Sequence, residues 1–173
     1  MNANMTPVDW AKRPILEKYA DFSGRASRPE YWWFVLALVI AFIVVGIVES
    51  IIGINHMILY SYGPLRALLW LATVVPSIAV GVRRLHDTDR SGWWMLLPIV
   101  PYTLAMVLGG AAMMGGAATG SGMGMMAGLG IAGIFAFIGM VAGLALLVFM
   151  VLPGTPGDNR YGPPAGPVPV PAE

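Results

Sequence analysis

The residues with the greatest capacity for chemistry lie in one short polar segment, which contains Arg83, Arg84, His86 and Asp87. If the preceding helix extends through this segment, Arg83, His86 and Asp87 share one face, because they are three and four residues apart. Asp87 can then accept a hydrogen bond from either arginine or from the imidazole. We refer to Arg83, Arg84, His86 and Asp87 as the polar clasp.

Three uses of the polar clasp are open. It can be purely structural, with charges that pair at a membrane surface and orient the turn between two spans. Its arginines can instead grip the phosphate of an anionic lipid, and Arg25 and Arg28 are further candidates for this role. An Asp–His pair beside a basic group can also serve acid–base chemistry, with His86 and Asp87 as the reactive groups.

The rest of the chain offers little support for catalysis. Ser91 is better explained as a helix cap, Asp89 as a solvated acid, and His56 has no second metal ligand at a recognisable spacing. The chain has no cysteine, which excludes thiol catalysis and iron–sulfur centres. We therefore expect a protein that is not an enzyme, with no catalytic residue, no metal site and no cofactor.

Composition places these residues in a membrane protein. The chain of 173 residues is 57% hydrophobic and only 11% charged, whereas about 25% of residues are charged in soluble domains. Its basic residues concentrate before the first apolar run and in the segment that holds the polar clasp, so they indicate membrane topology rather than nucleic-acid binding. Because the first 30 residues carry several charges and no apolar core, they are not a signal peptide, and the first apolar run is an uncleaved anchor.

The apolar runs predict an all-α, polytopic fold with four transmembrane helices, each near the roughly 20 residues that a span needs. Glycines are frequent between the last two runs, and each costs about 1 kcal/mol in a helix, so this stretch is expected to be a flexible Gly/Met-rich loop. Polar groups near the outer ends of the first two spans are expected to pair as Glu49 with Arg66. The predicted spans are residues 32–54, 65–82, 92–109 and 131–152, with the Gly/Met-rich loop at residues 110–130.

The segments outside the membrane domain (31–152) are also recognisable. Residues 1–30 contain a short amphipathic helix that starts at Thr6 and Pro7 and lies on the membrane surface. A Ser27–Glu30 capping box starts the first span. Residues 153–173 form a proline-rich tail. Four spans with the amino terminus inside place both basic segments and both termini in the cytoplasm.

Three sequence motifs resemble those of domain of unknown function 805, a family of small bacterial inner-membrane proteins. They are Phe22-Ser-Gly-Arg-Ala-Ser-Arg-Pro-Glu-Tyr-Trp32, then Arg83-Arg-Leu-His-Asp87 through Ser91-Gly-Trp-Trp94, then Pro153-Gly-Thr-Pro-Gly-Asp-Asn-Arg-Tyr-Gly162. The resemblance covers about residues 10–164 and implies an inner-membrane location and this architecture, but no activity. The chain departs from the family pattern by its Gly/Met-rich insert, which leaves open whether residues 92–152 make two spans or one span and a re-entrant segment.

These observations favour a non-enzymatic scaffold or adaptor in the bacterial inner membrane. Its expected partners are the lipid bilayer, with anionic headgroups as candidates, and a membrane protein or a second copy of the chain. An anionic-lipid-binding protein and a small transporter or channel are the alternatives. A transporter normally carries polar groups near mid-bilayer, and only Glu49 and the prolines qualify here.

Overall fold

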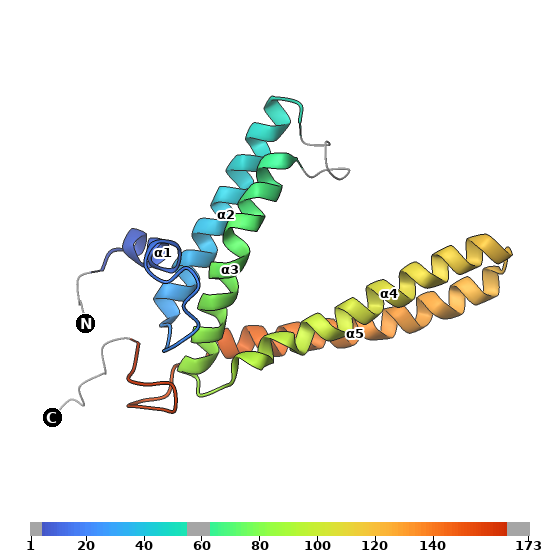
Figure 1. Ribbon diagram of the computed structural model, residues 1–173. Coiled ribbons are helices and arrows are strands. Elements are labelled where there is room, and N and C mark those ends of the chain that lie inside the picture. The colour runs from blue at the N-terminus through green and yellow to red at the C-terminus, as the bar shows by residue number, and fades with distance from the viewer. Residues whose placement is uncertain (1–4, 55–62, 166–173) are drawn as a thin grey trace. The chain divides into compact units, whose positions relative to one another are not determined.

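The computed structural model describes residues 5–54 and 63–165, so His56 and the last eight residues of the tail lie outside the described residues. The described part contains five α-helices, one short 3₁₀ helix and an isolated bridge between Asn159 and Gly162 (Figure 1). The helices are α1 (Pro7–Leu16), α2 (Arg28–Ile51), α3 (Pro64–Asp87), η1 (Gly92–Met95), α4 (Leu96–Thr119) and α5 (Gly122–Val151).

Within the described residues, four helical segments are long and apolar enough to cross a membrane, which confirms the predicted all-α, polytopic fold. They are Arg28–Ile51, Pro64–Asp87, Gly92–Thr119 and Gly122–Val151. The chain forms two compact units, one of residues 1–91 with residues 153–173 and the other of residues 92–152. The first unit therefore contains all three motifs almost completely, although 58 residues, 95–152, separate the second motif from the third.

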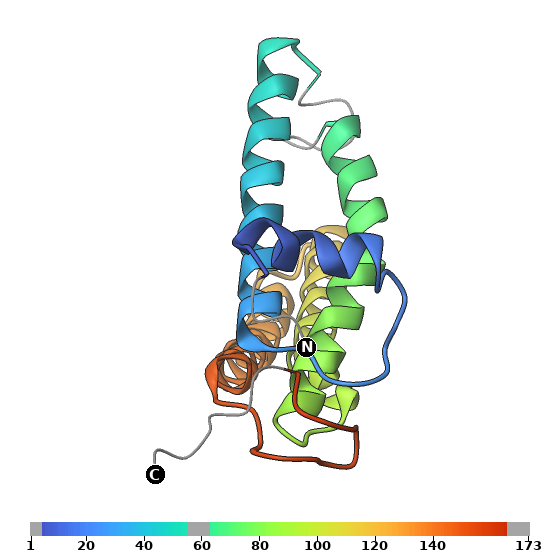
Figure 2. The same cartoon turned by 90° about the vertical axis from the view of Figure 1, so that its left-hand side faces the viewer.

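Helix α1 begins as its sequence predicts. The Thr6 side chain accepts from the backbone N–H of Asp9, and the Asp9 carboxylate accepts from the backbone N–H of Thr6, so a full capping box is present. Helix α1 lies across α2 and α3 (Figure 2). A short helix of this kind confirms the predicted amphipathic amino-terminal element.

Helices α2 and α3 run side by side, joined at the end where Ile51 and Pro64 lie (Figures 1 and 2). Their most buried apolar contact lies toward the opposite end, where Ala26, Phe34 and Val80 pack together. Helix α3 extends five residues beyond the predicted end at residue 82, so the whole polar clasp is helical. The condition for Arg83, His86 and Asp87 to share one helical segment, that the second span extends through them, is therefore met.

Pro76 lies inside α3 and removes the N–H that would otherwise bind the carbonyl of Ala72. The Tyr19 hydroxyl donates to this carbonyl at 2.7 Å, from the segment that follows α1. The hydroxyls of Thr73 and Ser77 donate to the carbonyls of Leu69 and Thr73 instead. The carbonyl freed by the proline is thus satisfied from outside the helix, which ties the amino-terminal segment to α3.

The predicted Gly/Met-rich loop at residues 110–130 is wrong, because almost all of this stretch is helical. Helix α4 continues to Thr119, and α5 begins at Gly122. The turn is only Gly120 and Ser121: Gly120 takes a left-handed φ of 66°, and the Ser121 side chain accepts from the N–H of Gly124. The Thr119-Gly120-Ser121 sequence carried these stop and start signals, but the glycine content obscured them.

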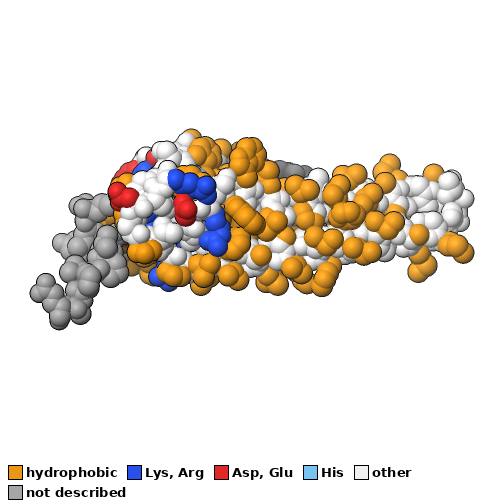
Figure 3. Space-filling model, turned by 90° about the horizontal axis from the view of Figure 1, so that it is seen from below, with side chains coloured by type: hydrophobic (Ala, Val, Ile, Leu, Met, Phe, Trp, Pro, Cys, Tyr) orange, Lys and Arg blue, Asp and Glu red, His pale blue; other side chains and the backbone are white. Residues whose placement is uncertain are grey.

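Close packing between α4 and α5 explains why the glycines are tolerated. A Cβ on Gly128 would collide with Ala112, and one on Gly116 would lie 2.6 Å from the Met125 Cβ. Nearer the other end, a Cβ on Gly139 would lie 3.0 Å from the Tyr102 ring. Small residues let helix backbones approach in this way, and in a bilayer a helix also satisfies its own backbone groups. The surface of this hairpin carries apolar side chains with no acidic or basic ones (Figure 3).

Candidate functional site

The candidate site is an ionic cluster at the end of α3, formed by Arg13, Arg25, Glu30, Arg83, Arg84 and Asp87. Asp87 is its first centre, with a side chain only 8% exposed. One carboxylate oxygen accepts from Nε of Arg25 at 2.9 Å, and the other accepts from Nη1 of Arg84. Each oxygen therefore meets a different guanidinium, one from the first motif and one from the second.

The third motif closes over this pair. Nη1 of Arg25 donates to the carbonyl of Gly157 at 2.7 Å, and Nη2 donates to the carbonyl of Thr155 at 2.6 Å. The backbone N–H of Thr155 donates to the Asp87 carbonyl at 2.8 Å. At Gly154 a Cβ would overlap the Asp87 carboxylate, so this approach requires glycine. One arginine thus joins three segments that are distant in sequence.

Glu30 is the second centre, and it corrects the predicted capping box. The Ser27 side chain does accept from the Glu30 N–H, at 3.4 Å. The Glu30 carboxylate, however, accepts from Arg83 at 2.5 Å and from Arg13 at 3.2 Å. Both Glu30 and Arg83 have fully buried side chains. A buried carboxylate gains more from two guanidinium groups than from one backbone donor at a helix end.

Only one of the three guanidinium nitrogens of Arg83 forms a hydrogen bond. Its Nη1 binds Glu30, whereas its Nε and Nη2 are buried without a hydrogen-bond partner. Arg84, by contrast, donates from Nη1 to both the Asp87 carboxylate and the Ala26 carbonyl. The backbone joins the two centres as well, since the Ala26 N–H donates to the Arg83 carbonyl at 2.9 Å.

The spacing suggested that the His86 imidazole binds Asp87, but its contacts are with other residues. Its Nδ1 lies 3.1 Å from the carbonyl of Gly24, so the tautomer with a proton on Nδ1 donates to that carbonyl. The imidazole stacks on the Tyr161 ring, with centroids 3.7 Å apart and planes within 4°. The Asn159 side chain donates to the His86 carbonyl at 2.9 Å. The carboxylate of Asp87 binds the two arginines, so the structure does not pair His86 with Asp87.

The sequence located only part of this cluster. The structure brings together Arg25, Arg83, Arg84 and Asp87, whereas Arg28 is exposed at the start of α2. Sequence reasoning missed Glu30 and Arg13, because Glu30 already had a capping role to explain it. It also missed Thr155, Asn159 and Tyr161, which were assigned to a tail. The resemblance of their segment to a family motif was the available signal.

At the opposite end of α2 and α3, Glu49 and Arg66 do pair. Nε of Arg66 donates to one carboxylate oxygen at 2.5 Å, and the Arg66 backbone N–H donates to the other at 3.0 Å. The Glu49 side chain is fully buried, while the Arg66 side chain is 20% exposed. Gly63 lies directly against the Glu49 carboxylate, as Gly154 lies against Asp87.

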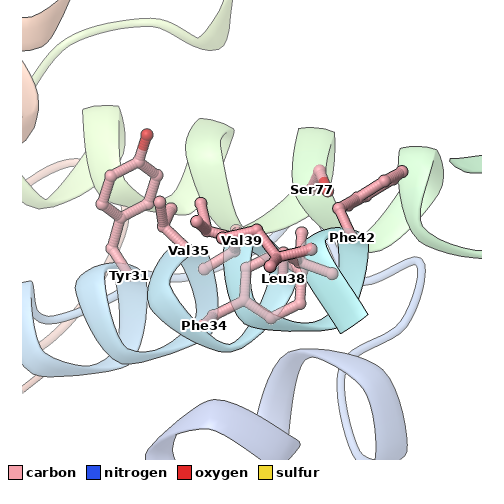
Figure 4. Close-up of a pocket in the computed structure, with 9 residues that line it drawn as sticks. Tyr31, Phe34, Val35, Leu38, Val39, Phe42 and Ser77 are labelled. Carbon is pink, nitrogen blue, oxygen red and sulfur yellow. The ribbon is translucent and has the colours of Figure 1, made fainter. Parts of the chain in front are cut away.

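The arrangement binds charges to each other rather than leaving reactive groups open. Among the residues that the structure describes, no group of three potential metal ligands occurs. A groove of about 480 Å³ lies between α2 and α3, lined by side chains that include Phe34, Leu38 and Phe42 (Figure 4). The Ser77 hydroxyl at its edge already donates to Thr73. This groove offers mainly apolar contact, and no carboxylate, imidazole or basic side chain is among the described residues that line it.

The comparisons with known proteins agree with this picture. The chain is 33% identical to inner membrane protein YhaH of Escherichia coli K12 over 156 residues, which cover 90% of this chain and 95% of that protein. It is 36% identical to inner membrane protein YhaI of the same strain over 149 residues, covering 86% and 88% of the two chains. An uncharacterized protein from that strain, YiiR, is 30% identical over 153 residues, covering 82% and 83%. No solved structure matches the chain.

A family model matches residues 19–163. The match begins at Tyr19, in the segment that follows α1, and ends at the residue after the third motif. This match includes every member of the ionic cluster except Arg13. The relatives and the four candidate spans together identify an integral inner-membrane protein. The chain belongs to the family described as protein of unknown function (DUF805).

Proposed function

We propose that this protein is a non-enzymatic scaffold or adaptor of the inner membrane, in which the polar clasp and Arg25 hold three chain segments in one arrangement. The observation that carries the proposal is Arg25, whose guanidinium binds Asp87 and the carbonyls of Thr155 and Gly157. An arginine whose three guanidinium nitrogens all bind groups within the protein has a structural role: it holds those groups together. A catalytic or ligand-binding arginine would keep donors for its substrate.

The same contacts support a topology with both termini in the cytoplasm. Arg25, Asp87 and Thr155 are in contact, and a span in a bilayer cannot separate residues that touch. An even number of crossings must then lie between Asp87 and Thr155, which two spans satisfy and one does not. Arginines gather at this end, as the positive-inside rule expects of a cytoplasmic surface.

The stability and interactions of two variants test the scaffold role. Asp87→Asn leaves two guanidinium groups without their shared carboxylate, which should cost about 3–5 kcal/mol at a buried site. His86→Gln keeps a donor for the Gly24 carbonyl and should melt closer to the parent. In native mass spectrometry from a gentle detergent, a scaffold retains a co-purifying membrane protein or second copy in His86→Gln and loses it in Asp87→Asn.

Two outcomes would reject this proposal. If Asp87→Asn melts at the parent's temperature, the cluster does not fasten the segments. If both variants fold normally and both lose a cellular phenotype of the deletion strain, His86 and Asp87 act in chemistry. Arg28→Gln is the matched control, because it removes an exposed cation near the cluster and should change neither melting temperature nor partner retention.

Reporter fusions test the proposed topology separately. Fusions after Gly63, Arg90 and Gly120 and at the carboxyl terminus of the full chain should read outside, inside, outside and inside. An outside signal at the carboxyl terminus would instead indicate three spans. It would also contradict the contacts between Arg25 and the third motif, on which the scaffold proposal rests.

A further inference from the structure

A second site lies away from the ionic cluster, in the groove between α1 and α2. Its volume is about 510 Å³, within the range of small-molecule sites. Each wall is one face of a helix, whose lining residues recur at intervals of three, four and seven. The principal lining residues are Val8, Lys12 and Ile15 of α1 and Trp33, Leu36 and Ile40 of α2.

The groove is lined by apolar side chains, with one charged exception. Among the described residues that line it, Lys12 alone is charged, and its side chain is exposed. The neighbouring acid on α1, Asp9, accepts from the backbone and hydroxyl of Thr6. Those hydrogen bonds hold the pKa of the Asp9 carboxyl below its ordinary value, with Thr6 as the main cause. Lys12 has no bonded carboxylate among the described contacts, in contrast to Lys18, which binds Asp21 at 2.8 Å.

The position of the groove along α2 indicates what can reach it. Trp33 is the last residue before the uninterrupted apolar run, and tryptophan prefers the headgroup level of a bilayer. Ile40 lies seven residues farther along the helix, about 10 Å deeper at 1.5 Å per residue. The groove therefore extends from the headgroup level into the hydrocarbon, where acyl chains are the surrounding molecules.

The walls of the groove are held in place by contacts outside it. Arg13, on the next position of α1, binds the buried Glu30 carboxylate at the start of α2. Beyond the helix end, the Tyr19 hydroxyl binds the Ala72 carbonyl of α3. Helix α1 is thereby fixed at both α2 and α3, so the groove exists before an occupant arrives and binding requires little ordering.

We propose that this groove binds one acyl chain of an anionic glycerophospholipid, with Lys12 at the lipid phosphate. The apolar stripes contact the chain, while the exposed Lys12 ammonium attracts the negative charge of a phosphodiester. Lys12 also attracts the Asp9 carboxylate electrostatically, but the two form no ion pair among the described contacts. The site goes beyond the scaffold role and does not depend on the ionic cluster, because none of the cluster's residues lines the groove. Failure of either proposal leaves the other unaffected.

Native mass spectrometry of the full chain in gentle detergent tests this proposal, with phosphatidylglycerol and phosphatidylcholine as probes. The parent should retain phosphatidylglycerol preferentially. Lys12→Gln should reduce that preference about fivefold, the factor equivalent to about 1 kcal/mol for one lysine at an anionic surface. Lys18→Gln is the matched control on the same segment and should keep the preference. Added inorganic phosphate should not displace the lipid, because the chain supplies part of the binding.

A second measurement does not rely on a variant. Phosphatidylglycerol with a photoreactive acyl chain should label peptides that contain residues 7–16 and 33–40. Labelling confined to α4 and α5 would overturn the proposal, as would an equal loss of preference in Lys12→Gln and Lys18→Gln. Displacement by inorganic phosphate would also overturn it, because it would indicate a phosphate site without a chain site.

Discussion

The two compact units of this protein are stabilised by different interactions. In the first, buried arginines and carboxylates from the first two motifs, together with backbone carbonyls of the third, hold α2, α3 and the carboxyl-terminal segment together. In the second, no acidic or basic side chain occurs, and α4 and α5 meet through small residues such as Gly128 and Ala112. Directional charge pairs can join irregular segments, whereas close helix packing needs two continuous helices. The difference implies that substitutions in the two units should fail in different ways.

The largest difference is expected between two arginine-to-lysine variants within the ionic cluster. Arg25→Lys removes a fork that binds a carboxylate and two carbonyls, and should cost about 1.5–3 kcal/mol for each charged hydrogen bond that is lost. Arg83→Lys keeps a donor for Glu30 and removes two buried nitrogens, Nε and Nη2, that have no hydrogen-bond partner. Its cost should therefore stay within about 1 kcal/mol.

Thermal unfolding of the purified variants in one detergent measures this contrast. Equal destabilisation of the two would indicate that charge alone matters and that the fork geometry of Arg25 does not.

In the second unit, which has no charged side chains, we expect stability to depend on the size of the side chains at the contact between α4 and α5. Gly128→Leu places a side chain where even a Cβ would collide with Ala112, and overpacking of this kind costs about 1–3 kcal/mol. Gly130→Leu is the control, since nothing lies within 4 Å of a Cβ at that position. Disulfide trapping of cysteine pairs across α4 and α5 should be lost in Gly128→Leu and kept in Gly130→Leu. Retained trapping in both would indicate that close approach is not required.

A smaller effect is expected where α3 lacks a backbone donor. Tyr19→Phe leaves the Ala72 carbonyl unsatisfied and should cost about 1 kcal/mol. Pro76→Ala restores an N–H four residues after Ala72, so Tyr19→Phe should cost less in that background. A double-mutant cycle measures the coupling between the two positions. Independent effects would indicate that the tyrosine does not compensate for the proline.

The smallest effect concerns a half-buried pair, Lys18 and Asp21, and depends on pH. A hydrogen bond from the Lys18 ammonium, with others from Ser23, holds the pKa of the Asp21 carboxyl below its ordinary value. A lowered folded-state pKa contributes stability above the unfolded value of about 3.9, and this is lost as pH falls toward the folded value. Asp21→Asn should therefore differ slightly from the parent at neutral pH and converge with it in acid. Gly128→Leu should show no such convergence, because its unit has no carboxylate.

The helices of the first unit were largely predictable, because their signals are local. Thr6 and Pro7 begin α1 as predicted, and the apolar run after Trp33 produced α2. Glu49 and Arg66 pair because two antiparallel spans bring their outer ends together. The Gly/Met-rich stretch was mispredicted because intrinsic helix propensity was the only available criterion. Contact between two helices outweighed that propensity.

The sequence by itself determined the class of the protein, since apolar length and charge segregation follow directly from residue order. The structure had to show that Arg83, Arg84, His86 and Asp87 share one helical segment, because the sequence predicted the second span only to residue 82. Only the tertiary structure decided which carboxylate each arginine meets, because Arg25 and Glu30 reach α3 through packing of Ala26 and Phe34 on Val80. The docking of Thr155 and Gly157 on Arg25 was likewise a tertiary result. Local patterns specify helices, but partners across 62 to 132 residues are selected by the geometry of the whole unit.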